Sequence, residues 1–175
     1  MKKGLLSWIV LLLAAGALIK LHLDSTPDLP ARFASHFDMA GRANGWQTKG
    51  DWGLGTLPLH LGTAALLVGL MSFVHRLPAR FINLPNPDYW RQPANFQLAC
   101  QYLRDWSRWF SAAELTWATF LDWQLFLANQ RQPPHLDSQA TNLLLAAAIL
   151  GTPIFVAVLL IRFSRKLPVN TGQDG

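Results

Sequence analysis

Long apolar runs alternate with polar segments along this chain of 175 residues. Nearly uninterrupted apolar sequence covers residues 4–23, 54–74 and 140–161, and a weaker run, residues 109–128, contains Glu114 and Asp122. Each run is close to the roughly 20 residues that a helix needs to cross about 30 Å of hydrocarbon. The pattern therefore predicts an all-α integral membrane protein, a single domain built as a bundle of four transmembrane helices.

The first run has a second interpretation as a cleaved signal peptide. Lys2 and Lys3 would form its basic start, and residues 15–17 (Ala-Gly-Ala) resemble a cleavage site. However, the apolar stretch is longer than the apolar core of a typical signal peptide, which has roughly 7 to 15 residues, and leucines continue beyond the expected cleavage site. We therefore expect a retained first span.

The distribution of basic residues predicts the orientation of the bundle, because cytoplasmic loops of membrane proteins are enriched in Lys and Arg. With a cytoplasmic N-terminus, ten Lys and Arg residues lie inside and five lie outside. Both termini are therefore expected in the cytoplasm, with outer loops at 24–53 and 129–139. The cytoplasmic parts would be a loop at 75–108, carrying an amphipathic helix from about residue 94, and a tail at 162–175.

The composition agrees with a membrane location. Only 14% of the residues are charged, against about a quarter in soluble proteins, and eight residues are Trp, a type enriched at membrane interfaces. The net charge of +5 is explained by basic residues that flank the apolar runs, so we expect no nucleic-acid partner. The single cysteine, Cys100, excludes an internal disulfide.

Two acids at membrane depth form the first candidate site. An acid there costs about 2.5–3.5 kcal/mol on insertion scales, so its presence requires a reason. Glu114 and Asp122 are eight residues apart, which places them on a broadly common helix side and about 12 Å apart along the axis. Depth counting suggests His60 as a partner for Asp122 and Arg162 as a partner for Glu114. These groups either hold the bundle together, form a proton or solute path, or act in catalysis.

The first outer loop is the second candidate site. Residues 38–41 (Asp-Met-Ala-Gly) and 42–45 (Arg-Ala-Asn-Gly) each have the composition of a tight turn. We expect an ordered pair of turns, anchored on the bundle by Phe37, Trp46 and Trp52. Zinc could use two His and a carboxylate from this side of the membrane, although the spacing matches no metal signature. The weak metal candidates are His22, His36 and Asp38, with Asp24 and Asp28 nearby, and no cofactor is predicted.

Two motifs resemble a known family. Leu29-Pro30, His36-Phe37-Asp38, Gly41, Gly45-Trp46 and Lys49, together with the later NLPNPDYW at residues 83–90, resemble the bacterial membrane domain of unknown function at the N-terminus of SdpI-type immunity proteins. The resemblance implies the bacterial cytoplasmic (inner) membrane and no established enzymology. The ligand-binding residues that we predict are His36, Asp38, Gly41, Trp46, Lys49, Asn83 and Asn86.

Three functions are compatible with the sequence. The first is a non-enzymatic protein whose outer loop recognises a toxic peptide or envelope ligand, in immunity or sensing, and whose proline-rich cytoplasmic loop contacts a protein partner. The second is a small proton or solute transporter component that uses Glu114 and Asp122 and forms a homo-oligomer. The third is a metal-dependent membrane enzyme, for which no serine-nucleophile, phosphate-loop or HExxH motif offers support.

Overall fold

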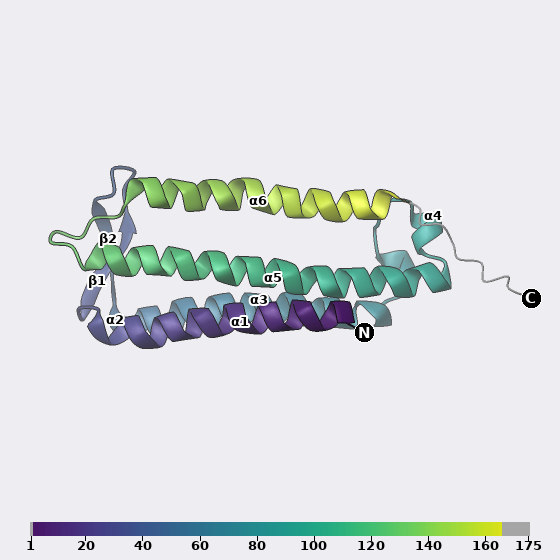
Figure 1. The fold of residues 1–175 in the computed structure, drawn as a ribbon, viewed down its shortest axis with the longest axis horizontal. Helices are drawn as coiled ribbons and strands as arrows, with labels where there is room; N and C mark the ends of the chain where they lie inside the picture. The colour runs from purple at the N-terminus through teal and green to yellow at the C-terminus, as the bar shows by residue number, and fades with distance from the viewer. Residues whose placement is uncertain (1, 166–175) are drawn as a thin grey trace, which may run out of the picture.

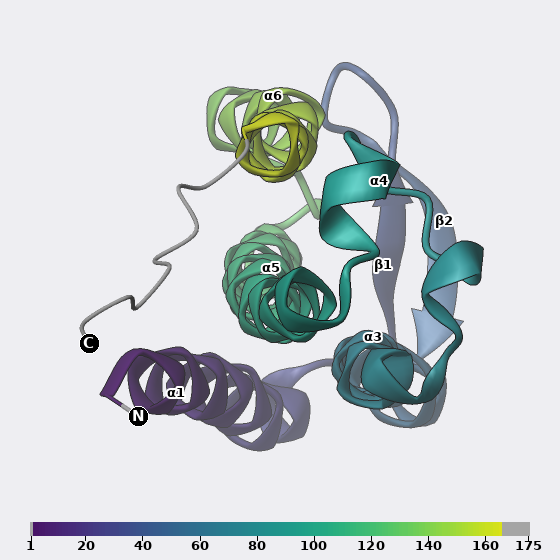
Figure 2. The ribbon, with the colours of Figure 1, turned by 90° about the vertical axis from the view of Figure 1, so that its right-hand side faces the viewer.

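Four long helices run side by side through the part of the chain that the computed structural model describes, residues 2–165 (Figure 1). They are α1 (Lys2–Ser25), α3 (Leu57–Phe73), α5 (Pro93–Asn129) and α6 (Ser138–Ser164). Helix α5 lies at the centre and contacts the other three, with α1 and α3 on one side and α6 on the other (Figure 2). The last residues of the predicted tail, 166–175, lie outside the described residues.

Three helical stretches of the described chain are long and apolar enough to cross a membrane. They are Gly4–Asp28, Lys49–Arg76 and Ser138–Ser164, and they coincide with three of the apolar runs in which spans were predicted. This is the architecture of an all-α membrane protein. Helix α5 does not reach the same hydropathy, because charged and polar residues occur throughout its sequence.

Helix boundaries differ from the prediction in two places. The amphipathic helix and the third span were expected as separate elements, but α5 is one continuous helix of 37 residues, about 55 Å long at 1.5 Å per residue. The second helical run begins at Lys49 rather than at residue 54. It consists of α2 (Lys49–Asp51), a π-helical turn η2 (Trp52–Thr56) and then α3. Thr48 caps this run, because its side chain accepts a hydrogen bond from the Asp51 N–H.

The predicted outer loop, residues 24–53, contains a β-hairpin, the outer hairpin, that the all-helical prediction missed. A short 3-10 turn, η1 (Thr26–Asp28), leads into strand β1 (Arg32–Phe37), which pairs antiparallel with β2 (Ala43–Thr48). The first predicted turn is confirmed, since the Gly41 N–H donates to the Asp38 carbonyl at 2.9 Å and Gly41 has φ +76°. The second predicted turn was wrong: Asn44 and Gly45 lie within β2 and have no positive φ.

Gly45 is explained by a close approach across the hairpin instead of by a turn. A Cβ atom at this position would lie 2.8 Å from Cβ of His36, which is closer than side-chain atoms pack. The register of the strands shifts on both sides of His36, which is the local irregularity of a bulged hairpin. The Asn44-Gly45 pair, which the sequence suggested as a turn, therefore belongs to a closely packed pair of strands.

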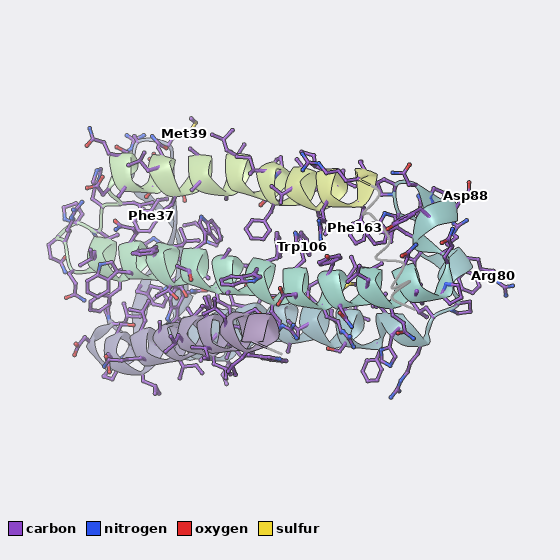
Figure 3. The ribbon with its side chains drawn as sticks, turned by 45° about the vertical axis from the view of Figure 1, so that its right-hand side comes forward. Phe37, Met39, Arg80, Asp88, Trp106 and Phe163 are labelled. Carbon is purple, nitrogen blue, oxygen red and sulfur yellow. The ribbon has the colours of Figure 1, made fainter. Side chains whose placement is uncertain are left out.

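At the opposite end of the bundle, short helical turns connect α3 to α5 (Figure 1). They are η3 (Val74–Arg76), η4 (Ala79–Phe81) and α4 (Pro87–Trp90). Trp90 is fully buried there and packs edge-on against Phe163 of α6, with ring centroids 5.0 Å apart. Phe163 lies on the side of α6 that faces α5 in the side-chain view (Figure 3).

The tightest packing joins α1, α3 and α5. Their shared core contains Leu11, Leu18, Val68 and Leu115, interleaved with the small residues Ala14, Ala64, Ala112 and Ala118. Small residues allow helix backbones to approach closely, which is the main source of packing energy between helices in a membrane. Helix α6 has a different character, because Phe163 is its one buried residue among those described.

Candidate functional site: polar pairs on α5 beneath the outer hairpin

Two histidine–carboxylate pairs connect α5 to its neighbours. His22 Nε2 of α1 lies 2.8 Å from Asp122 Oδ2, and His60 Nδ1 of α3 lies 2.7 Å from Glu114 Oε1. The first pair is almost completely buried, with 3% and 2% of the side chains exposed, and the second is partly buried. Each acid on the central helix therefore holds one neighbouring helix.

Both partners differ from those that depth counting suggested. His60 pairs with Glu114 instead of Asp122, because the second helical run begins at Lys49 and His60 consequently lies deeper in the bundle. Asp122 pairs with His22, whose helix packs along α5. Arg162 does not reach Glu114; it lies over the Tyr102 ring, 4.2 Å from its centroid, and donates to the Tyr102 hydroxyl.

Aromatic residues cover the buried pair from the hairpin side. The His22 ring stacks on Trp52, with centroids 5.1 Å apart and planes 15° apart. Phe33 of β1 meets Trp52 edge-on at 5.4 Å. These residues form a small core with Leu29, and with Leu125 and Phe126 of α5. The Trp52 anchor was predicted from the sequence, whereas Phe33 was not.

Nitrogen atoms without partners remain inside this covered region. His22 Nδ1 and Trp52 Nε1 are both buried and have no hydrogen-bond partner among the described residues. Buried polar groups are nearly always hydrogen-bonded, to protein or to an ordered water. Two buried N–H or ring-nitrogen groups near the hairpin end of α5 therefore lack a hydrogen bond from the described protein atoms.

Asn129, near the end of α5, fastens the hairpin to the bundle. Its Oδ1 accepts from the Ala34 N–H at 2.8 Å, and its Nδ2 donates to the Ala34 carbonyl at 2.9 Å and to the Leu125 carbonyl at 2.8 Å. The Asn129 side chain thus makes the two backbone hydrogen bonds to β1 that a further strand of the sheet would make at Ala34. Asn129 and Ala34 are both buried, at 5% and 0% exposure.

The hairpin tip is held by Asp38, a predicted ligand-binding residue and metal candidate. Its Oδ1 accepts from the N–H groups of Ala40 and Arg42, both at 2.9 Å, and its Oδ2 accepts from Arg42 Nε at 2.8 Å. The backbone hydrogen bond from Arg42 is the main reason that the pKa of Asp38 lies below its usual value. Both oxygens of this carboxylate therefore serve the turn.

Gly41 and Lys49, also predicted for the ligand site, make contacts within the loop. The Gly41 carbonyl accepts from the Leu136 N–H at 2.9 Å, and a Cβ on Gly41 would lie 2.5 Å from the Leu136 carbonyl. Lys49 Nζ donates to the Pro27 carbonyl at 2.8 Å. These residues join the hairpin to the second outer loop and to the end of α1.

His36 and Trp46 are the predicted loop residues that remain open to their surroundings. His36 is exposed and lies 3.0 Å, through Nδ1, from the Ser35 hydroxyl. Trp46 is 46% exposed, so it is not the buried anchor that the sequence suggested. Met39 at the tip is fully exposed and projects away from the helices (Figure 3). These side chains form an outward surface on an otherwise fixed hairpin.

The predicted metal group is not assembled in the described structure. His22 is buried against Trp52 and Asp122, whereas Asp38 lies at the hairpin tip and binds Arg42. Asp24 pairs with Lys20 at 2.6 Å. Among the described residues, no three His, Cys, Asp or Glu side chains come close enough to hold a metal ion.

At the opposite end of the bundle, the NLPNPDYW segment binds the end of α6. Asn86 Nδ2 donates to the Ser164 carbonyl and Trp90 Nε1 donates to the Phe163 carbonyl, both at 2.7 Å. The last carbonyls of a helix lack partners within the helix, so these two side chains act as its C-terminal cap. Asn86 adopts a left-handed conformation at φ 55°, and Asn83 is exposed.

A further polar cluster lies toward the N-terminal end of α1 and was not predicted. Ser7 Oγ donates to Asp105 Oδ1 at 2.6 Å and accepts from Arg108 Nε at 3.0 Å. Arg108 also lies over the Trp8 ring, 5.2 Å from its centroid. No spacing rule connects residues from helices so far apart in the chain, so the sequence carried no signal for this contact.

Comparison with known proteins gives no match for this chain, either to a protein family, to a curated protein or to a solved structure. The resemblance to the membrane domain of SdpI-type immunity proteins therefore rests on its two motifs and stays a prediction.

Proposed function

We propose that the chain is a multi-pass protein of the bacterial cytoplasmic membrane in which α1, α3, α5 and α6 all cross the bilayer. The inclusion of α5 is supported by its contacts, because it packs between three helices that are apolar enough to span. Its acids are paired with His22 and His60, which lowers the cost of placing them at membrane depth. The excess of Lys and Arg supports cytoplasmic termini, with the hairpin outside.

In this proposal the outer hairpin is a recognition element for an envelope ligand. The observation that carries it is the difference between the two sides of the hairpin. Phe33 and Ala34 are buried and fastened to α5, whereas Met39, Arg42 and Trp46 are exposed. An ordered surface with aromatic and basic side chains suits an acidic or amphipathic peptide, since little conformational entropy is lost when a fixed surface binds.

The likeness to SdpI-type immunity proteins adds a toxic peptide as one such ligand. A conformational change caused by binding outside would be transmitted to the cytoplasmic side through α5, which runs without interruption from the hairpin to the segment that follows α4. The proline-rich segment at residues 82–90 would then present an altered surface to a protein partner. This mechanism is non-enzymatic and needs no cofactor.

The experiment is a comparison of variants in living cells. A photo-crosslinking residue at Met39 should capture a specific extracytoplasmic partner, and the double substitution His36→Ala and Trp46→Ala should abolish that product. Phe81→Ala, an exposed residue at the other end of the bundle, is the matched control and should leave the product unchanged. Equal crosslinking in all of these proteins, with equal expression, would refute recognition by the hairpin.

A second candidate function is a proton path, supported by the arrangement of titratable groups on α5. Glu114 and Asp122 are each hydrogen-bonded to a histidine and lie about 12 Å apart along the helix axis. Proton relays through membranes are commonly built from Asp, Glu and His side chains. Vesicles that contain the purified protein and an internal pH dye should then show proton flux that Glu114→Gln abolishes. The absence of flux under an imposed gradient would exclude this function.

A further inference from the structure

A cavity of about 380 Å³ lies between α5 and α6. Helix α6 is on the opposite side of α5 from α1 and α3 (Figure 2). Aromatic residues form much of its wall, and Glu114 is the only charged residue among the described residues that line it. The α6 side combines Phe155 with small residues, among them Ala147, Ala148 and Gly151. Pockets for small molecules typically occupy about 300–1,000 Å³, so this cavity has the size of a binding site.

The cavity exists because aromatic side chains hold α6 away from α5. Trp117 Nε1 donates to the Leu144 carbonyl at 2.8 Å, and Trp106 Nε1 donates to the Phe155 carbonyl at 3.3 Å. Trp106 points from α5 into the space between the two helices (Figure 3). Opposite these spacers, Gly151 has no atom within 4 Å of the place where a Cβ would lie. The large aromatic residues of α5 and Phe155 of α6, next to the small residues of α6, leave the space open.

Glu114 gives this apolar cavity its chemical character. Its Oε1 is bound to His60 of α3, on the other side of α5. Its Oε2 is buried and has no hydrogen-bond partner among the described residues. A buried carboxylate oxygen without a partner is costly, and the cost falls when a cation or hydrogen-bond donor comes close. One oxygen of the Glu114 carboxylate can therefore still accept a hydrogen bond or attract a cation.

We propose that the α5–α6 cavity binds a lipophilic ammonium ion. The rings of Phe110, Trp117 and Phe155 line the cavity beside Glu114, and aromatic faces attract organic ammonium groups through cation–π interactions. The carboxylate supplies the opposite charge, and the apolar wall accepts the alkyl or aryl part of the ligand. An uncharged lipid chain gains no electrostatic attraction from Glu114, and an anion is repelled by it. This site is independent of recognition by the outer hairpin.

The test compares a cation with a neutral molecule of the same shape. The probes are benzyltrimethylammonium and neopentylbenzene, in which carbon replaces the ammonium nitrogen. Binding to the full-length protein in nanodiscs is followed by tryptophan fluorescence, because Trp106 and Trp117 lie beside the cavity. We expect the cation to bind roughly tenfold more tightly than the neutral probe, as about 1.4 kcal/mol of cation–π and charge attraction gives.

Glu114→Gln is the decisive variant, since it removes the charge and keeps an oxygen for His60. It should reduce the preference for the cation by removing the charge attraction, whereas Asn44→Ala, on the hairpin, should leave the preference unchanged. If Glu114→Gln does not fold, Phe155→Leu replaces it and should weaken cation binding about threefold or more by removing one ring. Equal binding of both probes to the parent protein, or no binding of the cation, would overturn the proposal.

Discussion

Asn129 illustrates how much a single side chain contributes to the placement of the outer hairpin. Its amide hydrogen-bonds both the N–H and the carbonyl of Ala34. Asn129→Ala should leave the buried Ala34 N–H without a partner and should lower the free energy of unfolding by about 1–3 kcal/mol. Thermal unfolding in detergent and proteolysis of the hairpin would measure the effect. Asn44→Ala, at an exposed position of the same hairpin, should change neither.

Gly41 is the position in the hairpin where a side chain is least tolerated. A positive φ costs an L-residue roughly 1–2 kcal/mol, and the added Cβ would lie 2.5 Å from the Leu136 carbonyl. Gly41→Ala should therefore destabilise the protein and separate the two outer loops. Gly50→Ala is the matched control, because the nearest atom to its Cβ would be 3.8 Å away. Similar melting temperatures for the two variants would show that this account of Gly41 is wrong.

The Asp38 turn should respond to acid in a defined direction. Hydrogen bonds, first of all from the Arg42 N–H, lower the pKa of Asp38 below the usual 3.8. A lowered folded-state pKa means that the stabilisation is complete above pH 3.8 and is lost as the pH falls through the folded pKa. The protection of the Ala40 and Arg42 amides, that is, their exchange rate relative to the intrinsic rate at the same pH, should consequently fall only below about pH 4. Asp38→Asn should have no acid transition in the turn.

At the scale of the elements, the buried His22–Asp122 pair fixes α1 against α5. His22→Ala should leave a buried carboxylate without its partner and should cost about 3–5 kcal/mol of stability. His60→Ala should cost less, because 23% of the Glu114 side chain is exposed. The double variant His22→Leu and Asp122→Leu should regain much of the loss, since apolar pairs of similar volume often replace buried ion pairs. Chemical denaturation of the three proteins would test this order.

Helix positions could be predicted from the sequence, whereas contacts between helices could not. Apolar periodicity and length located the helices that became α1, α3 and α6, because hydrocarbon thickness fixes the length of a span. Pairing depends on which helices become neighbours, and nothing in the spacing of His22 and Asp122 reveals that α1 lies beside α5. For this reason both predicted partner assignments were wrong, although Glu114, Asp122 and His60 do form polar pairs between helices.

The hairpin was missed for a related physical reason. Ala43, Asn44 and Gly45 have the composition of a turn, but strand pairing and the close approach of His36 determine their conformation. Asp38 and Gly41, in contrast, act locally, and their turn was predicted correctly. A turn held by local backbone hydrogen bonds can be predicted from the sequence. A glycine that is required by close packing across a strand pair, such as Gly45, cannot be distinguished in the sequence from a glycine that is required by a turn, such as Gly41.

For the molecule as a whole, the orientation in the membrane gives the most direct prediction. In a Cys100→Ser background, Met39→Cys should react with a membrane-impermeant maleimide in intact cells, because residue 39 is fully exposed at the hairpin tip. Phe81→Cys, at the opposite end of the bundle and 67% exposed, should react only after permeabilisation. The reverse pattern would invert the topology, and labelling of both in intact cells would show that α3, the long helix between residues 39 and 81, does not cross.

The two tryptophans that hold α6 have a consequence for the evolution of the protein. Trp106 and Trp117 donate to backbone carbonyls of α6, as do Asn86 and Trp90 at its end. Every residue type offers the same carbonyl, so these contacts place few demands on which apolar side chains α6 carries. Selection should therefore preserve the indoles and Asn86 while the sequence of the last helix diverges freely among apolar residues, apart from the small residues and Phe155 that face the cavity.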